Sequence, residues 1–132
     1  MAAVALLRLA ALTGEHRYRA AALAVLSPLA SAIARSPLAF GNLAWALELA
    51  VRDVREVAIA GSADSAATAA LLAVVHGRWD PTRVLAWGEA DGVPLLNDRP
   101  PVDGRPAAYV CRGFVCERPV IDPEALRAQL NK

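Results

Sequence analysis

Two cysteines, Cys111 and Cys116, are the residues of this sequence whose type and spacing point most directly to chemistry. They lie in the run AAYVCRGFVCERPV, residues 107–120, where strand-forming residues surround Arg112-Gly113. Thiols at this spacing could form a disulfide, act as a redox couple, or supply half of a metal site. The sequence therefore places a thiol pair in a strand and turn.

The register of that turn decides which chemistry the two cysteines can perform. If Arg112-Gly113 is a two-residue hairpin loop, Cys111 faces Phe114 and Cys116 lies diagonally, about 7–8 Å away. That distance is too long for a disulfide, whose Cβ atoms are roughly 3.8 Å apart. If the loop spans residues 112–115, the sulfurs face each other and can bond. We favour two buried thiols and keep a disulfide as the second interpretation.

Metal and cofactor sites have little support in the sequence. A structural zinc site needs four ligands, but His16 and His76 lie in segments distant from the cysteines. The turn GSAD at residues 61–64 stands where a phosphate could bind before a helix. However, it matches neither GxGxxG nor GxxxxGK[ST], and Asp64 adds a negative charge. We expect no metal ligand, no cofactor and no catalytic residue in this chain.

Other ionisable residues have the pattern of surface groups. His16 stands among charged residues in the first turn of an expected helix, and His76 stands in the last turn of another, where a positive charge suits the helix dipole. The arginines of the second half are spread out and interleaved with acids, so we expect them to be solvated. They are Arg78, Arg83, Arg99, Arg105, Arg112 and Arg118.

Composition argues against several classes of partner. The sequence has 132 residues and a net charge of +1, so it lacks the positive charge of a nucleic-acid-binding domain. No apolar run reaches the roughly 18 residues that cross a membrane, and Arg8 interrupts the apolar N-terminal run, which argues against a targeting peptide. We expect a cytoplasmic chain. Its hydrophobic fraction of 56% is high for a small domain and indicates apolar surface that a partner covers.

Residues 1–53 have the pattern of helices. Apolar residues recur at helical spacing, and Pro28 and Pro37 each follow a serine, as at the first turn of a helix. We expect Pro28 to kink or restart the chain and Pro37 to begin a helix. The expected helices span residues 2–12, 15–26 and 37–52.

Residues 54–132 have the pattern of a small α/β unit. A strand, a helix that Ser62 or Asp64 caps, and a second strand form a βαβ unit, whose strands pair in parallel. Gly77 should end this helix in the left-handed conformation, and Asp122-Pro123 should begin the last helix. The expected elements are strands at 57–60 and 84–87, a helix at 65–76, a loop at 88–106, the cysteine-bearing strand and turn at 107–115, and the C-terminal helix. The fold class is α+β and mainly helical.

Several segments carry a resemblance to a known family. They are LLRLAALTG with Tyr18 (residues 6–18), PLAF (37–40), EVAIAG (56–61), Pro94-Leu95 and AYVCRGFVCERPV (108–120). On these residues the chain resembles the C-terminal end of the spermatogenesis-associated protein 20-like family. These are long bacterial and animal proteins that contain a thioredoxin-like domain. The last segment is the most specific of the matches.

The resemblance implies a piece of a larger architecture. Family members resemble an N-terminal thioredoxin-like domain followed by a toroid of paired helices, like that of six-hairpin glycosidases and sugar epimerases. Residues 1–53 would then be the terminal helices of this (α/α) toroid, and residues 54–132 a small α/β tail packed on it. No active-site residue of the family maps onto a position of this chain.

Three functions follow as expectations. The first is non-catalytic: the chain closes the helical toroid of a longer thioredoxin domain-containing protein. Its partners would be the rest of that polypeptide, or a second copy, through apolar helix faces, and neither nucleic acid nor a membrane. The second is a contribution to a carbohydrate-active or thiol-redox enzyme that other domains complete. The third is a stand-alone protein-interaction module.

Overall fold

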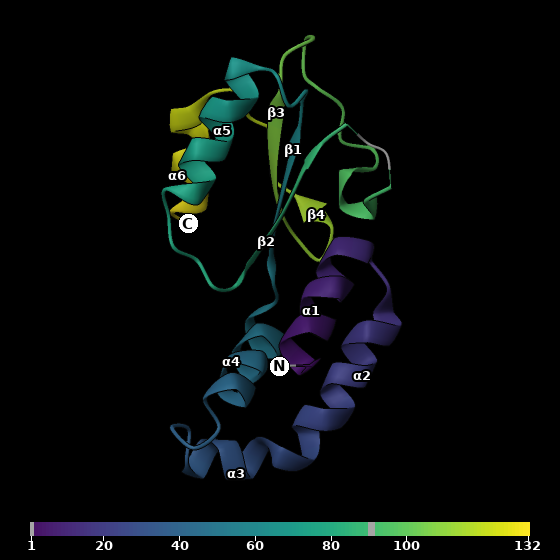
Figure 1. The fold of residues 1–132 in the computed structure, drawn as a ribbon, viewed down its shortest axis with the longest axis vertical. Coiled ribbons are helices and arrows are strands. Elements are labelled where there is room, and N and C mark those ends of the chain that lie inside the picture. The colour runs from purple at the N-terminus through teal and green to yellow at the C-terminus, as the bar shows by residue number, and fades with distance from the viewer. Residues whose placement is uncertain (1, 90–91) are drawn as a thin grey trace.

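The computed structural model describes residues 2–89 and 92–132, with a helical end and an α/β end (Figure 1). The helical end contains α1 (Ala2–Thr13), α2 (His16–Leu26), the 3-10 helix η1 (Ser27–Leu29), α3 (Ala30–Arg35) and α4 (Gly41–Arg52). The α/β end contains β1 (Arg55–Ala60), α5 (Ala66–His76), β2 (Arg83–Gly88), the 3-10 helix η2 (Pro94–Leu96), β3 (Ala107–Arg112), β4 (Val115–Cys116) and α6 (Pro123–Leu130). The α+β, mainly helical fold class is confirmed.

The helical end begins with a tight hairpin of α1 and α2, which lie side by side in Figure 1. Gly14 ends α1 with a φ of +73°, and its N–H donates to the carbonyl of Ala10 at 2.8 Å. Glycine adopts this left-handed conformation without a steric penalty. The chain then restarts at Pro28 through η1, as expected. In the part of the chain that the structure describes, no helix has both the length and the apolar character to cross a bilayer.

Helix α4 begins later than the sequence predicts. Residues 37–40 form turns, and the helix starts at Gly41 rather than at Pro37. Leu38, which lies in these turns, is 99% exposed, whereas Leu49 within the helix is fully buried. Phe40 packs against the apolar core from within the turn, so the helix can only begin after it.

Helix α5 differs from the expectation at both ends. Its cap is Ser65, whose Oγ accepts a hydrogen bond from the N–H of Thr68 at 3.4 Å, rather than Ser62 or Asp64. Gly77 has a right-handed φ of −66°, and its N–H donates to the carbonyl of Ala73. The helix therefore ends in a right-handed turn and does not need the left-handed glycine that the sequence suggests.

The four strands pair in the order β2-β1-β3-β4. β1 is parallel to β2, as the βαβ pattern predicts, and antiparallel to β3, which pairs with β4 in a hairpin. Because β1 is paired on both sides and its faces are covered, five of its six residues are buried. β4 is a short strand at the edge of the sheet.

Different elements pack against the two faces of the sheet. Helices α5 and α6 lie over one face, where Val57 and Ile59 of β1 pack with Leu71 and Leu126. Alternate residues of β1 and β3 point to the opposite face, which packs against α1 and η2. Cys111 belongs to this second face. The division of the chain at residue 53 stays a prediction, and one apolar cluster runs across it, from α1, α2 and α4 to the sheet.

Candidate functional site

The two cysteines face each other across the β3–β4 hairpin. Gly113 and Phe114 form its loop, with φ values of +55° and +64°, which is the pattern of a type I′ turn. Arg112 therefore pairs with Val115, and Cys111 pairs with Cys116. In this register a disulfide can form. The loop has two residues, but they are Gly113 and Phe114 rather than Arg112 and Gly113.

A disulfide joins Cys111 and Cys116 in the structure. Directly opposed residues of an antiparallel pair have adjacent side chains on one face, which brings the two sulfurs to bonding distance. The favoured interpretation of two free thiols is thus not the state that the structure has. The two cysteines differ in exposure: Cys111 is 2% exposed, whereas Cys116 is half-buried on the edge strand.

Arg99 supplies a positive charge beside the disulfide. Its Nε and Nη2 both donate to Sγ of Cys116 at 3.3 Å. Its Nη1 donates to the carbonyls of Leu95 and Asn97 at 2.7 and 3.1 Å, and the guanidinium lies over the Phe114 ring, 5.6 Å from its centroid. Arg99 is only 9% exposed, so the expectation that it is solvated is wrong. In residues 2–89 and 92–132 it forms no ion pair with a carboxylate.

Glu56 places a buried carboxyl group on the other side of Cys111. It lies opposite Cys111 on β1 and is 3% exposed. Its Oε2 accepts a hydrogen bond from the N–H of Phe114 at 2.8 Å. Burial raises the pKa of Glu56, and this effect outweighs the lowering by the hairpin N–H groups and by the charge of Arg99. Glu56, Cys111 and Cys116 therefore form a row across β1, β3 and β4.

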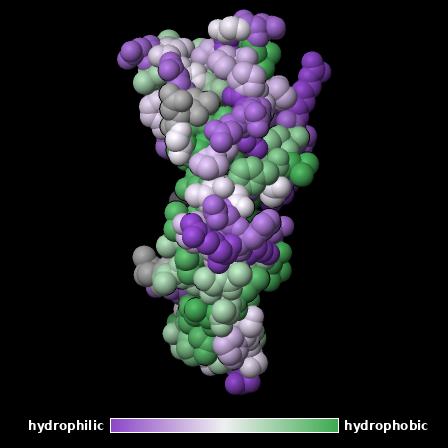
Figure 2. Space-filling model, turned by 90° about the vertical axis from the view of Figure 1, so that its right-hand side faces the viewer, coloured by the Kyte–Doolittle hydropathy of each residue, from purple (hydrophilic) through white to green (hydrophobic). Residues whose placement is uncertain are grey.

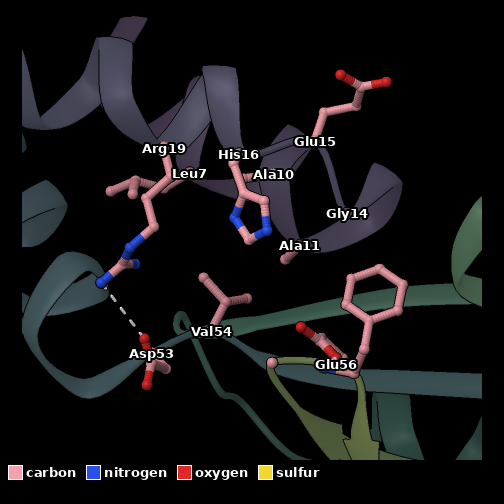
Figure 3. Close-up of a pocket in the computed structure, with 12 residues that line it drawn as sticks. Leu7, Ala10, Ala11, Gly14, Glu15, His16, Arg19, Asp53, Val54 and Glu56 are labelled. Atoms are coloured by element: carbon pink, nitrogen blue, oxygen red, sulfur yellow. Dashed lines mark hydrogen bonds and ion pairs between the residues drawn. The ribbon is translucent and has the colours of Figure 1, made fainter.

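A cleft of about 290 Å³ opens beside this row, between the α1–α2 turn, the start of β1 and the hairpin loop (Figure 3). His16 points into the cleft, whereas Glu15 points away from it. Arg19 borders one side, with its Nη2 3.5 Å from Asp53 and 2.8 Å from the carbonyl of Ala50, to which it donates. The imidazole of His16 stays exposed, as its polar neighbours predict.

The cleft has few groups that could carry out chemistry. None of the described residues that line it is a serine, a threonine or a cysteine. Phe114 lines both this cleft and the depression beside Cys116. Within the described ranges, no three His, Cys, Asp or Glu side chains gather into a metal-binding group. Two of the cleft's polar side chains already bind other groups of the fold: Arg19 contacts Asp53 and the carbonyl of Ala50, and Glu56 accepts the N–H of Phe114. The hairpin row is therefore the stronger candidate site.

The GSAD turn after β1 is an ordinary strand-to-helix connection. A Cβ on Gly61 would lie 2.5 Å from Oγ1 of Thr68 and 2.8 Å from Cβ of Pro106. Glycine is therefore required there because two neighbours approach the backbone closely, which is a packing reason. His76 is exposed in the last turn of α5, away from the cysteines in sequence and in the fold.

Sequence reasoning found the cysteines but missed Glu56 and Arg99. Glu56 carried a signal, because a lone acid in the apolar strand EVAIA occupies a position that alternation assigns to a buried face. For Arg99 we can identify no such signal in the sequence. It lies in a loop rich in proline and aspartate, and its neighbours in the fold include Phe114 and Cys116 of the hairpin, which are distant in sequence.

Comparison with known proteins gives one consistent result. No family model matches the chain, and no solved structure matches it. Among curated proteins, spermatogenesis-associated protein 20 of rat is 28% identical over 96% of this chain, that of human 27% and that of mouse 26% over the same share. The chain is similar to spermatogenesis-associated protein 20 along almost its whole length. This confirms the family resemblance that the motifs indicate.

The match is very unequal in length. The chain spans 17% of the length of the spermatogenesis-associated protein 20 relatives. The similarity is consistent with a C-terminal segment of that family. It assigns no role to a residue of this chain.

Proposed function

We propose that this chain is the C-terminal portion of a longer protein similar to spermatogenesis-associated protein 20, and that its role there is structural. One observation carries the proposal: 96% of the chain corresponds to 17% of the relatives. In this proposal α1–α4 close a toroid of paired helices, and the α/β unit packs on it as a tail. A thioredoxin-like domain elsewhere in the longer, cytoplasmic polypeptide would carry the chemistry.

Exposed apolar side chains on the helical end support this role. Leu38 and Val51 are 99% and 74% exposed, and Leu9 and Val25 are also exposed. Figure 2 shows hydrophobic side chains gathered over the helical end, below a band of polar ones. Large apolar surface of this kind usually marks an interaction site. Further helix pairs of a toroid would cover it.

The middle helices are thinly packed, which also supports a missing neighbour. α2 has two buried residues, Ala22 and Leu26, and α3 has one, Ile33. A helix of a globular protein normally buries a broad apolar stripe against the rest of the fold. α2 and α3 therefore have room for a second packing partner.

A thiol-redox contribution is the second candidate, and the cysteine hairpin favours it. Cys111 and Cys116 are aligned for a bond, and Arg99 contacts one of them. The carbohydrate-active alternative rests on the family resemblance alone. The interaction-module alternative shares the exposed apolar face with the structural role, and differs in that one separate protein would cover it.

The proposal is tested by the association of the isolated chain in solution. Sedimentation velocity over roughly a hundredfold range of concentration should show the mass rising with concentration, and the unfolding midpoint should rise with it. Replacing Leu38→Ser and Val51→Ser together should weaken this association. The matched control is Trp79→Ser, an exposed apolar residue of the α/β end, which should leave it unchanged. A monomer with a sharp, concentration-independent transition would contradict the proposal.

A further inference from the structure

We propose that the Cys111–Cys116 pair is a thiol–disulfide exchange site, in which Cys116 reacts with an outside thiol or disulfide and Cys111 resolves the product. The partner class is a peptide or protein that contains a thiol or a disulfide. This inference does not depend on the structural role proposed above, since it rests on side chains within one hairpin and its neighbours.

The two sulfurs differ in their access to a partner. Cys116 lies on the edge strand β4 and lines an open depression of about 510 Å³, together with Pro94, Tyr109 and Phe114. Cys111 lies inside the sheet and is 2% exposed. Exchange proceeds by attack of a thiolate on an accessible sulfur. An outside group therefore reaches Cys116 first.

Arg99 is a buried cation that forms no ion pair with a carboxylate of residues 2–89 and 92–132 while the disulfide is intact. Buried charges are normally paired, yet in the described part of the chain its contacts are two carbonyls, an aromatic face and Sγ of Cys116. Reduction changes this, because a Cys116 thiolate would accept charge-assisted hydrogen bonds from Nε and Nη2. Positive neighbours stabilise thiolates and make cysteines reactive. The guanidinium thus favours Cys116 as the nucleophile.

Glu56 is placed to exchange a proton with Cys111. The two residues are direct cross-strand neighbours on β1 and β3, so their side chains share one face. Burial keeps the carboxyl group protonated to a higher pH than usual, since the pKa of Glu56 is raised. Cys111 needs a proton donor when it leaves as a thiolate, and a proton acceptor when it attacks. Its buried position makes solvent a poor source of either.

The exchange balances as a two-electron, two-proton reaction. Cys116 first loses its proton to solvent, and its thiolate attacks a partner disulfide, which forms a mixed disulfide and releases one partner sulfur as a thiolate. Cys111 then gives its proton to Glu56 and attacks Sγ of Cys116, which forms the intramolecular bond and releases the second partner sulfur. The two released partner thiolates take up the two protons that Cys116 gave to solvent and Cys111 gave to Glu56, so the chain is oxidised and the partner is reduced to a dithiol. In the reverse direction, Cys111 is the leaving group and takes its proton from Glu56.

The position of the bond fits exchange better than stabilisation. The cysteines are five residues apart, and a disulfide that closes so short a loop removes less chain entropy from the unfolded state than one that closes a long loop. The hairpin register is also held by backbone pairing of Arg112 with Val115. The fold therefore depends little on the bond, and can tolerate its opening.

The first test compares the reactivity of the two cysteines in the reduced 132-residue chain. Limiting iodoacetamide at neutral pH, with peptide mass spectrometry, should alkylate Cys116 several times faster than Cys111. Arg99→Gln should slow the reaction of Cys116 roughly threefold to tenfold, because the lost thiolate fraction is partly offset by higher intrinsic nucleophilicity. Arg99→Lys should keep most of the rate. The matched control, Arg118→Gln, removes an exposed arginine near Cys116 and should have no effect.

The second test traps the mixed disulfide and does not need a change at Arg99. With oxidised glutathione as the probe, reduced Cys111→Ser should form a stable adduct at Cys116, and Cys116→Ser should form little at Cys111. The wild-type pair should move between dithiol and disulfide across glutathione buffers while circular dichroism shows the chain still folded. Equal reactivity of the two cysteines, or a bond that opens only on unfolding, would overturn the proposal.

Discussion

The buried carboxyl group of Glu56 serves both the fold and the candidate site. Its carboxyl oxygen accepts the N–H of Phe114, a backbone donor of the hairpin loop that would otherwise lack this partner. A buried donor without a partner costs about 1–3 kcal/mol, which offsets part of the cost of burying the carboxyl group. The protonated form costs less to bury than the ionised form, which is why burial raises the pKa of Glu56.

We therefore predict that Glu56 makes stability fall as the pH rises. A raised folded-state pKa means that the native chain holds the proton to a higher pH than the unfolded chain does. The stability is fully present below the ordinary value of 4.5 and is lost as the pH rises through the folded value. The Glu56→Gln side chain keeps an acceptor for the N–H of Phe114 and cannot ionise. Urea denaturation at several pH values should therefore show that the free energy of unfolding of Glu56→Gln does not fall in this way as the pH rises.

The control for this prediction is Glu89→Gln, since Glu89 is exposed. Its stability should follow that of the wild type at every pH. Other groups, such as Asp80, titrate in both chains and cancel in the difference. Wild-type and Glu56→Gln curves that run parallel from acid to neutral pH would show that Glu56 is not the group responsible.

At the residue scale, the sequence identified the cysteines but not their setting. The loop lies at Gly113-Phe114 because a type I′ turn needs two positive φ values, and phenylalanine is not a residue that usually supplies one. Here the Phe114 ring packs against the core and under Arg99, and this contact offsets the backbone strain. Turn propensities alone cannot predict that side-chain packing offsets backbone strain in this way.

Among the elements, the α1–α2 hairpin approaches the β3–β4 hairpin where Gly14 lies beside the Phe114 ring. A Cβ on Gly14 would lie 3.3 Å from the Phe114 ring, so glycine allows the two turns to approach each other. The same residue has a left-handed φ of +73°. Both properties make Gly14 hard to replace.

We predict that Gly14→Ala destabilises the chain by about 1–2 kcal/mol, because alanine meets a steric penalty in the left-handed region and displaces the ring. Gly41→Ala is the matched control. Gly41 begins α4, and a Cβ added there would meet no atom within 4 Å. This change should be neutral or stabilising by up to about 1 kcal/mol. Urea denaturation of both variants checks this, and equal effects at the two positions would refute the account of the Gly14 contact.

The order and type of the elements follow well from the sequence, and the boundaries follow less well. The apolar pattern of the sequence predicted α1, α2, β1, α5 and β2, and the structure has an element of the expected type at each place. α2 nevertheless buries only Ala22 and Leu26 among its described residues. Pro37 led to a wrong helix start and Gly77 to a wrong backbone conformation, because the preferences of single residues do not include the packing of their neighbours. Phe40 delays the start of α4 by packing on the core, and Gly77 ends α5 within the right-handed region.

For the whole molecule, the uneven surface is the main finding. The sheet is covered on both faces, whereas the helical end keeps apolar side chains such as Leu38 and Val51 exposed. The sequence indicated this through its hydrophobic fraction of 56%. It could not show where the excess lies, because composition does not tell which helix faces meet a neighbour. A longer chain accounts for that surface without requiring a separate partner.

The most direct test of this account is the mass of the native polypeptide in its host, measured by immunoblot with an antibody raised to this chain. We predict a band several times heavier than 13.9 kDa, since the chain spans 17% of its relatives. A band at 13.9 kDa would contradict the account. The chain would then act by itself, and its exposed helices would need a separate partner.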